Sequence, residues 1–247
     1  MQFRSLIAGF VVAATAVATV SATSAIDADL AIKVAGEARS LWHAHVATVG
    51  DYAVAVANDN KALAQAIQPH ALEVSPNMTQ WLSNWYGDKE ESLSKFKTLF
   101  SDHIVTLAAI VDATKAKEGD KVAELKKKLT EGGKQLAAVI ETLNPEAYPK
   151  DVVFALLSEH ENLAVAAGAA LIAQEWEAGY ATHLAGFEQS KQVADALAKG
   201  VFVKLSNATA AAVAQQVNTP VSAALSSTAN TRWVAAPSLV AIVAMLL

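Results

Sequence analysis

Apolar residues recur every three or four positions through most of the chain between Asp27 and Asn207, and the strict alternation typical of β-strands is nearly absent. Proline and glycine interrupt this pattern at only a few points. Long amphipathic helices joined by short connections usually pack side by side in alternating directions. The pattern therefore predicts an all-α protein, an antiparallel bundle of four or five helices.

The predicted elements, in chain order, are a helix over 27–58, a short helical piece over 61–67, an irregular segment over 69–87, a helix from about 88, a helix over 121–143 and a proline-free helical stretch over 151–205. Asp88 and Glu91 have the three-residue spacing of a capping box. As one helix, the last stretch would be about 80 Å long, against about 48 Å for the first helix. We therefore expect it to break between Gln174 and Gly179.

The N-terminus has the pattern of a secretory signal peptide over residues 1–22. Arg4 supplies the positive charge, Ser5–Val20 is almost wholly apolar, and small residues precede a cleavage point after Ala22. A second possible cleavage point follows Ala25. The alternative is a retained membrane anchor, but the apolar run is shorter than the ~20 residues that span a bilayer.

The C-terminus has the pattern of a glycosylphosphatidylinositol (GPI) attachment signal. Trp233–Leu247 is apolar, a mostly polar spacer precedes it, and Ser222-Ala223-Ala224 supplies small residues upstream. We therefore expect a helical bundle over 23–207, an Ala-rich stalk over 208–222 with lipid attachment at Ser222, and a propeptide over 223–247. A short conventional membrane span is the alternative for the tail.

The composition of the chain excludes several classes of function. The chain has 247 residues, 19 Lys and Arg against 24 Asp and Glu, a net charge of −5 and no cysteine. The acidic balance argues against a general nucleic-acid binder, which would need a basic face. Without cysteine the chain can form no disulfide, thiol nucleophile or thiolate zinc site. In an exported protein, the sequons at Asn77 and Asn207 would be glycosylation sites.

Histidine is the main chemical lead. Four of the six histidines fall on the apolar stripes of four different predicted helical segments: His45, His103, His160 and His183. His183 belongs to a stripe with Trp176, Tyr180 and Phe187. A buried polar group without a partner costs about 1–3 kcal/mol, so four such positions are unusual. If the rings meet at one level, they could bind a transition metal such as Zn, Cu, Fe or Ni, or a haem. The alternative is that each is a boundary residue bonded to a carbonyl or to water.

Established catalytic motifs are missing. The chain has no E-x-x-H, H-E-x-x-H, G-x-S-x-G, P-loop or G-x-G-x-x-G. The paired carboxylates Glu159 and Glu161 stand beside polar residues, which predicts a solvated position for both. Lys126, Lys127 and Lys128 predict a solvated helix face. Trp81–Tyr86 predicts a lid over one end of the core or, alternatively, a binding loop.

The chain also resembles a group of uncharacterised bacterial helical proteins that carry LW-x-x-HV, YG, HI and HL pieces in this order. These pieces correspond here to Leu41–Val46, Tyr86-Gly87, Asp102–Ile104, and His160 with Leu163 nearby. A further histidine of that group falls at Phe187, and His183, one turn earlier, would replace it. The resemblance implies a histidine-bearing bundle and no particular activity.

The sequence thus favours a GPI-anchored cell-surface protein on the plasma membrane or cell wall, tied to the membrane by its lipid and with a non-enzymatic binding or structural role. The other hypothesis is a metal- or haem-binding bundle that uses the core-facing histidines. An enzyme with a site at the Trp81–Tyr86 segment is a third reading.

Overall fold

The structure is a computed structural model that describes residues 28–218, with side chains through Ala208. The chain divides into two units, 1–210 and 211–247, and only the first eight residues of the second, 211–218, are among those described. The predicted signal peptide, the lipid-attachment residue Ser222 and the propeptide over 223–247 lie outside the described residues.

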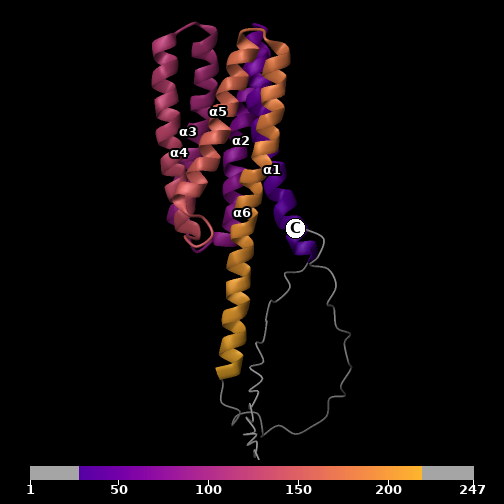
Figure 1. Cartoon of the computed structure of the whole chain (residues 1–247), viewed down its shortest axis with the longest axis vertical. Helices are drawn as coiled ribbons and strands as arrows, with labels where there is room; N and C mark the ends of the chain where they lie inside the picture. Colours follow the sequence, from indigo (N-terminus) through magenta and orange to yellow (C-terminus); the bar gives the residue numbers. More distant parts are fainter. Residues whose placement is uncertain (1–27, 219–247) are drawn as a thin grey trace, which may run out of the picture. The chain divides into compact units, whose positions relative to one another are not determined.

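The described residues form six α-helices that pack in alternating directions, as Figure 1 shows. In chain order they are α1 (Ala28–Ala57), α2 (Lys61–Tyr86), α3 (Glu90–Lys115), α4 (Gly119–Leu143), α5 (Lys150–Ile172) and α6 (Trp176–Asn218). Residues 28–218 contain no strand. The predicted all-α antiparallel bundle is therefore confirmed, with six helices in place of four or five.

The sixth helix arises because the segment predicted to be irregular is part of α2. This helix runs continuously through Pro69 and Pro76. Each proline leaves the carbonyl four residues earlier, on Gln65 or Leu72, without its helical donor. All four residues are exposed, so water can reach the freed carbonyls, while the opposite face of α2 packs into the core. Burial of that face outweighs the local cost of the prolines.

Three turns of one type join α1 to α2, α3 to α4 and α5 to α6. Each contains one residue with positive φ: Asp59 at 57°, Lys117 at 59° and Gln174 at 62°. The next amide donates back to a carbonyl five residues earlier, as in a Schellman motif. These bonds join Asn60 to Ala55, Glu118 to Ala113 and Glu175 to Ala170, each at 2.9 Å. The helix break at Gln174 falls at the start of the interval predicted from helix length.

Two local predictions are wrong. α3 begins after Lys89, which makes no side-chain cap, and Asp88 instead accepts a hydrogen bond from Lys204 at 2.9 Å. Trp81 and Tyr86 form no loop, since they lie in α2 and are buried in the main core. The Tyr86 hydroxyl lies 3.1 Å from that of Tyr148 inside this core.

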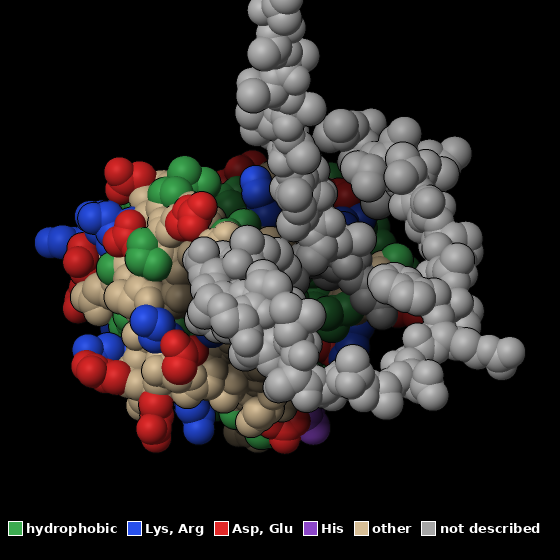
Figure 2. Space-filling view, turned by 90° about the horizontal axis from the view of Figure 1, so that it is seen from below, with side chains coloured by type: hydrophobic (Ala, Val, Ile, Leu, Met, Phe, Trp, Pro, Cys, Tyr) green, Lys and Arg blue, Asp and Glu red, His purple; other side chains and the backbone are tan. Residues whose placement is uncertain are grey.

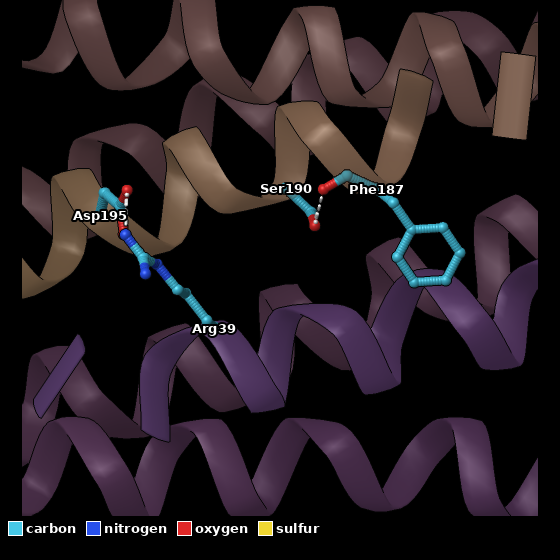
Figure 3. A network of polar contacts seen from close by, with 4 residues as sticks. All are labelled: Arg39, Phe187, Ser190 and Asp195. Atoms are coloured by element: carbon cyan, nitrogen blue, oxygen red, sulfur yellow. Dashed lines mark hydrogen bonds and ion pairs between the residues drawn. The ribbon is translucent and has the colours of Figure 1, made fainter. Parts of the chain in front are cut away.

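The face of α6 that packs inward also differs from the predicted aromatic stripe. Trp176 and Tyr180 are 43% and 62% exposed, whereas Gly179 and Gly186 are buried. Close helix packing selects the small residues, because they let two backbones approach. Further along α6, Asp195 forms an ion pair with Arg39 of α1 at 2.7 Å, and Figure 3 shows this pair bridging the two helices.

Charged side chains of both signs are interspersed over the face of the bundle seen in Figure 2. Lys126, Lys127 and Lys128 are exposed on α4, as predicted for a solvated face. None of the helices within the described part of the chain is both long enough and apolar enough to cross a membrane.

Candidate metal centre

Three of the four predicted histidines meet in the middle of the bundle. His45, His103 and His160 come from α1, α3 and α5, which run in the same direction and pack pairwise against one another. Each offers one ring nitrogen, and the three nitrogens lie within 4.8 Å of one another. The ring centroids are 5.4 Å apart for His45 and His103, 5.3 Å for His45 and His160, and 6.1 Å for His103 and His160. We call this group the histidine triad.

The triad forms one layer of the bundle because the three helices share a direction and a register. Side chains three residues before the histidines form the layer on one side: Trp42, Phe100 and Leu157, all buried. Side chains four residues after them line a cavity on the other side: Val49, Leu107 and Ala164. Residues three and four apart lie on the same helix face, so aligned helices repeat their contacts in layers.

Two aromatic rings close the triad on the first side. The Trp42 ring meets His160 edge-on at 5.4 Å between centroids and His45 at 5.9 Å. The Phe100 ring stacks on His103 at 5.9 Å with an interplanar angle of 4° and lies 5.2 Å from His45. These contacts fix the planes of the three imidazoles before any ligand binds.

The triad is deeply buried, and its nitrogens have no partner. Exposed fractions are 1% for His45, 6% for His103 and 2% for His160. Neither ring nitrogen of any of the three makes a hydrogen bond within the protein. Each buried polar atom left unpaired costs about 1–3 kcal/mol. The triad therefore holds several unused electron-pair donors in the core.

Burial keeps two of the rings neutral. Burial, and then repulsion from His160 and His103, hold the pKa of His45 well below its ordinary value. Burial, and then His103, lower the pKa of His160 to about 3, and the amide of Gln189 opposes part of that shift. Neutral imidazole is the form that binds a metal. At neutral pH these two rings have no proton to lose on binding.

A buried carboxylate stands behind the triad. Glu161 Oε1 lies 3.5 Å from His103 Nδ1, and the two side chains are only 5% and 4% exposed. Its Oε1 makes no hydrogen bond. The absence of a side chain at Gly133 of α4 creates the space, because a Cβ there would lie 2.6 Å from this oxygen. The predicted solvated position for Glu161 is therefore wrong, although its partner Glu159 is exposed.

Gln189 is a second polar group missed by the sequence reasoning. This buried residue of α6 donates from Nε2 to the Leu156 carbonyl at 2.7 Å, and its Oε1 has no hydrogen-bond partner. It acts on His160, whose pKa it raises. Metal-binding histidines usually direct their second nitrogen to a carboxylate or carbonyl. Glu161 and Gln189 supply such groups for His103 and His160.

The triad needs only a small contraction to fit a metal ion. Three points 4.8 Å apart have their centre about 2.8 Å from each, and bonds from zinc to imidazole nitrogen are about 2.0–2.1 Å long. Each ring would have to move inward by roughly 0.7 Å. Three histidines also leave the fourth tetrahedral position free, which is the arrangement of catalytic zinc sites.

His183 does not join the triad. It is half-buried on α6, and its ring lies where a Cβ on Gly50 would have to be. It packs edge-on against Phe187 at 4.9 Å, and burial lowers its pKa. Phe187, which points from α6 toward α1 in Figure 3, also lies 5.6 Å from the ring of His43. His183 nevertheless lines the same cavity as His45 and His160.

The predicted glycosylation residues are both on the surface. Asn77 is exposed on α2, and Asn207 is exposed on α6, where its amide donates to Glu146 at 3.2 Å.

No family model, curated protein or solved structure matches this chain. The site itself is therefore the basis for the proposed function.

Proposed function

We propose that the protein is a metal-binding helical bundle in which His45, His103 and His160 hold one transition-metal ion. The observation that carries the proposal is the convergence of three buried imidazoles whose nitrogens have no other partner. A stable core would place apolar side chains at these positions, because unpaired polar atoms cost free energy there.

Charge supports the same proposal. Glu161 is the only buried carboxylate among the residues with described side chains. A buried charge requires a partner of opposite sign. His45 and His160 are held neutral by burial, so they do not provide one. His103 Nδ1 lies 3.5 Å from Glu161 Oε1 and forms an ion pair with it only when the ring is protonated. A divalent cation bound between the rings would supply positive charge next to Glu161 while all three rings stay neutral.

The donor set limits the ion. Three neutral imidazoles suit Zn, Cu, Fe or Ni, whereas Mg and Ca prefer oxygen ligands. The cavity beside the triad has a volume of about 20 Å³, which is about the space of one water molecule. A porphyrin does not fit such a space, so the site favours a bare ion over haem.

Metal analysis of protein purified without a polyhistidine tag tests the proposal. We expect one ion per chain after loading with Zn²⁺ or Co²⁺ and removal of the excess. Thermal unfolding should move upward, because an ion present at about 100 times its Kd adds about 2.7 kcal/mol to the free energy of unfolding. For a chain of this size that corresponds to roughly 5–11 °C.

His70 provides a matched control, since its side chain is 71% exposed on α2 and lies outside the triad. His103→Asn should abolish both stoichiometric metal and the thermal shift, and His70→Asn should leave both intact. Equal loss in the two variants, or no metal in the wild type, would contradict the proposal.

We also propose an extracellular setting, with the chain tied to the membrane by a GPI lipid. The support is the pair of terminal sequence patterns. Phosphatidylinositol-specific phospholipase C should release the protein from intact cells, once an enzyme-resistant, inositol-modified anchor has been excluded. Continued membrane retention in a validated assay would reject the lipid anchor without affecting the metal site.

A further inference from the structure

One side of the histidine triad opens into a small apolar cavity. The cavity has a volume of about 20 Å³ and touches His45 and His160 directly. Its nearest walls are Val49, Leu107 and Ala164, the layer four residues beyond the triad. Ala164 is the smallest of these three, so the α5 side of this layer leaves space that a larger side chain would fill.

Two other sides of the triad are occupied. Trp42 and Phe100 pack against the rings from the layer below. Glu161 fills the space behind His103. An ion held by three imidazoles has a fourth position to fill. The cavity is the better placed space for it, because it touches two of the three rings, whereas a larger cleft between α3 and α4 touches His103 alone.

We propose that the site, when it holds Fe²⁺, binds one diatomic neutral molecule, nitric oxide or carbon monoxide, in this cavity. The inference rests on the proposed metal site and names the ligand class for its open position. Binding consists of one coordinate bond to the metal, with no transfer of electrons or groups to another molecule.

Size and polarity select this class. About 10–15 Å³ of such volume holds one water, so about 20 Å³ accommodates one or two heavy atoms and no organic substrate. The walls are mostly apolar, so a polyatomic anion would lose its hydration without hydrogen bonds in return. A neutral diatomic molecule loses little hydration. Water can occupy the same position when no diatomic molecule is present.

The cavity also has an outer end. It extends to His183 and Thr182 of α6. His183 is only half-buried, packs directly over Gly50 and lines this end of the cavity. A rotation of this one ring would admit a small molecule, and side-chain rotations of this kind are fast compared with unfolding.

Titration of the Fe²⁺-loaded protein with nitric oxide, without oxygen, tests the inference. Iron content is measured first, and the iron–nitrosyl complex is then followed by electron paramagnetic resonance. We expect one nitric oxide per iron. A wild-type chain that takes up no iron, Zn²⁺ or Co²⁺ rejects the metal site and this inference together. A chain that binds Zn²⁺ or Co²⁺ but no iron, or one that holds iron but forms no nitrosyl, rejects the inference alone.

Two cavity variants sharpen the test. Ala164→Leu fills the cavity and should weaken nitric oxide binding by about tenfold or more while iron stays bound. Ala155→Leu, at an exposed position of the same helix, should change it less than about twofold. Equal affinities in the two variants would overturn the inference.

Because Ala164→Leu could disturb folding, Leu107→Ala provides an independent measurement. It enlarges the cavity, so methyl isocyanide, a neutral ligand of three heavy atoms, should bind the Fe²⁺-loaded variant and change its ultraviolet–visible spectrum. Wild-type Fe²⁺ protein should show no such change at the same concentration. Binding of methyl isocyanide to the wild type, or no gain in Leu107→Ala, would contradict the size limit.

Discussion

Acid should destabilise the metal-free protein through His160. Burial lowers the pKa of this ring to about 3 in the folded state, against 6.5 for an unperturbed histidine. Between these two pH values the His160 ring is protonated in the unfolded chain and neutral in the folded chain. The free energy of unfolding is therefore unaffected by protonation of this ring above about pH 6.5, and it falls progressively as the pH falls toward about 3.

The size of the effect follows from the shift. At about 1.4 kcal/mol per pKa unit, the complete loss is about 5 kcal/mol, which is a large part of the free energy of unfolding of an ordinary domain. Only part is lost at moderate acidity, about 2.5 kcal/mol between roughly pH 7.5 and 4.5. His45 acts in the same direction, because its pKa is also lowered. The metal-free bundle should therefore lose stability progressively as the pH falls below about 6.5.

Urea unfolding of the metal-free protein across this pH range measures the effect. His160→Leu removes the titrating ring, so its free energy of unfolding should fall by about 2.5 kcal/mol less than that of the wild type between roughly pH 7.5 and 4.5. His70→Leu changes an exposed ring and should follow the wild type. If wild type and His160→Leu give parallel curves, His160 is not buried as a neutral ring and the reasoning fails.

Two further variants test the carboxylate behind the triad. Glu161→Gln keeps the shape but removes the charge, so metal affinity should fall by about 10- to 100-fold in a competitive chelator titration, and an unchanged affinity would exclude a role for the charge. Gly133→Ala places a Cβ 2.6 Å from Glu161 Oε1 and should lower the free energy of unfolding by about 1–3 kcal/mol. The control Gly132→Ala places its Cβ in open space and should not lower it. Equal stability of the two variants would contradict the packing described for Glu161.

The sequence allowed the histidines of the triad to be placed on inward faces, because helical periodicity is a local property. In the helix predicted from about residue 88, Phe96, Phe100, His103 and Leu107 recur every three or four positions, and the structure buries all four. The helix break near Gln174 followed equally well from length alone. The apolar stripe depends on neighbours within about two turns of the same helix, and the break depends only on the lengths of two predicted helices.

The meeting of the three rings could not be predicted in this way. Whether rings on α1, α3 and α5 share a level depends on the directions and register of these helices, and these depend on α2 being a complete helix. That helix was not predicted because it contains Pro69 and Pro76. The free-energy cost of a proline inside a helix can be read from the sequence, whereas the free energy gained by burying the opposite face of the helix cannot. Without α2 the relative directions of the other helices stay undetermined.

Glu161 shows a second limit. It follows His160 directly and stands among polar residues, so local pattern places it at the surface. It is buried because α4, which precedes α5 in the chain, presents Gly133 at the point of contact and leaves room for a carboxylate. The inward face of α6 was missed for a similar reason, since glycines pack there and the aromatic residues Trp176 and Tyr180 stay exposed. Small residues carry little hydrophobic signal, yet they decide how closely helices approach.

The buried polar cluster formed by the triad, Glu161 and Gln189 does not stabilise the metal-free fold. The unpaired nitrogens of the triad and the unpaired oxygens of Glu161 and Gln189 each cost free energy in the metal-free fold. Buried charged and polar clusters can often be replaced by apolar residues of similar volume at no loss, or with a gain. In the adjacent layer, three residues earlier on each helix, the bundle fills the equivalent positions with the large apolar side chains of Trp42, Phe100 and Leu157. A bound ion removes this cost, because it uses the ring nitrogens as ligands and balances the charge of the Glu161 carboxylate. The same residues therefore stabilise the fold only when the metal is present.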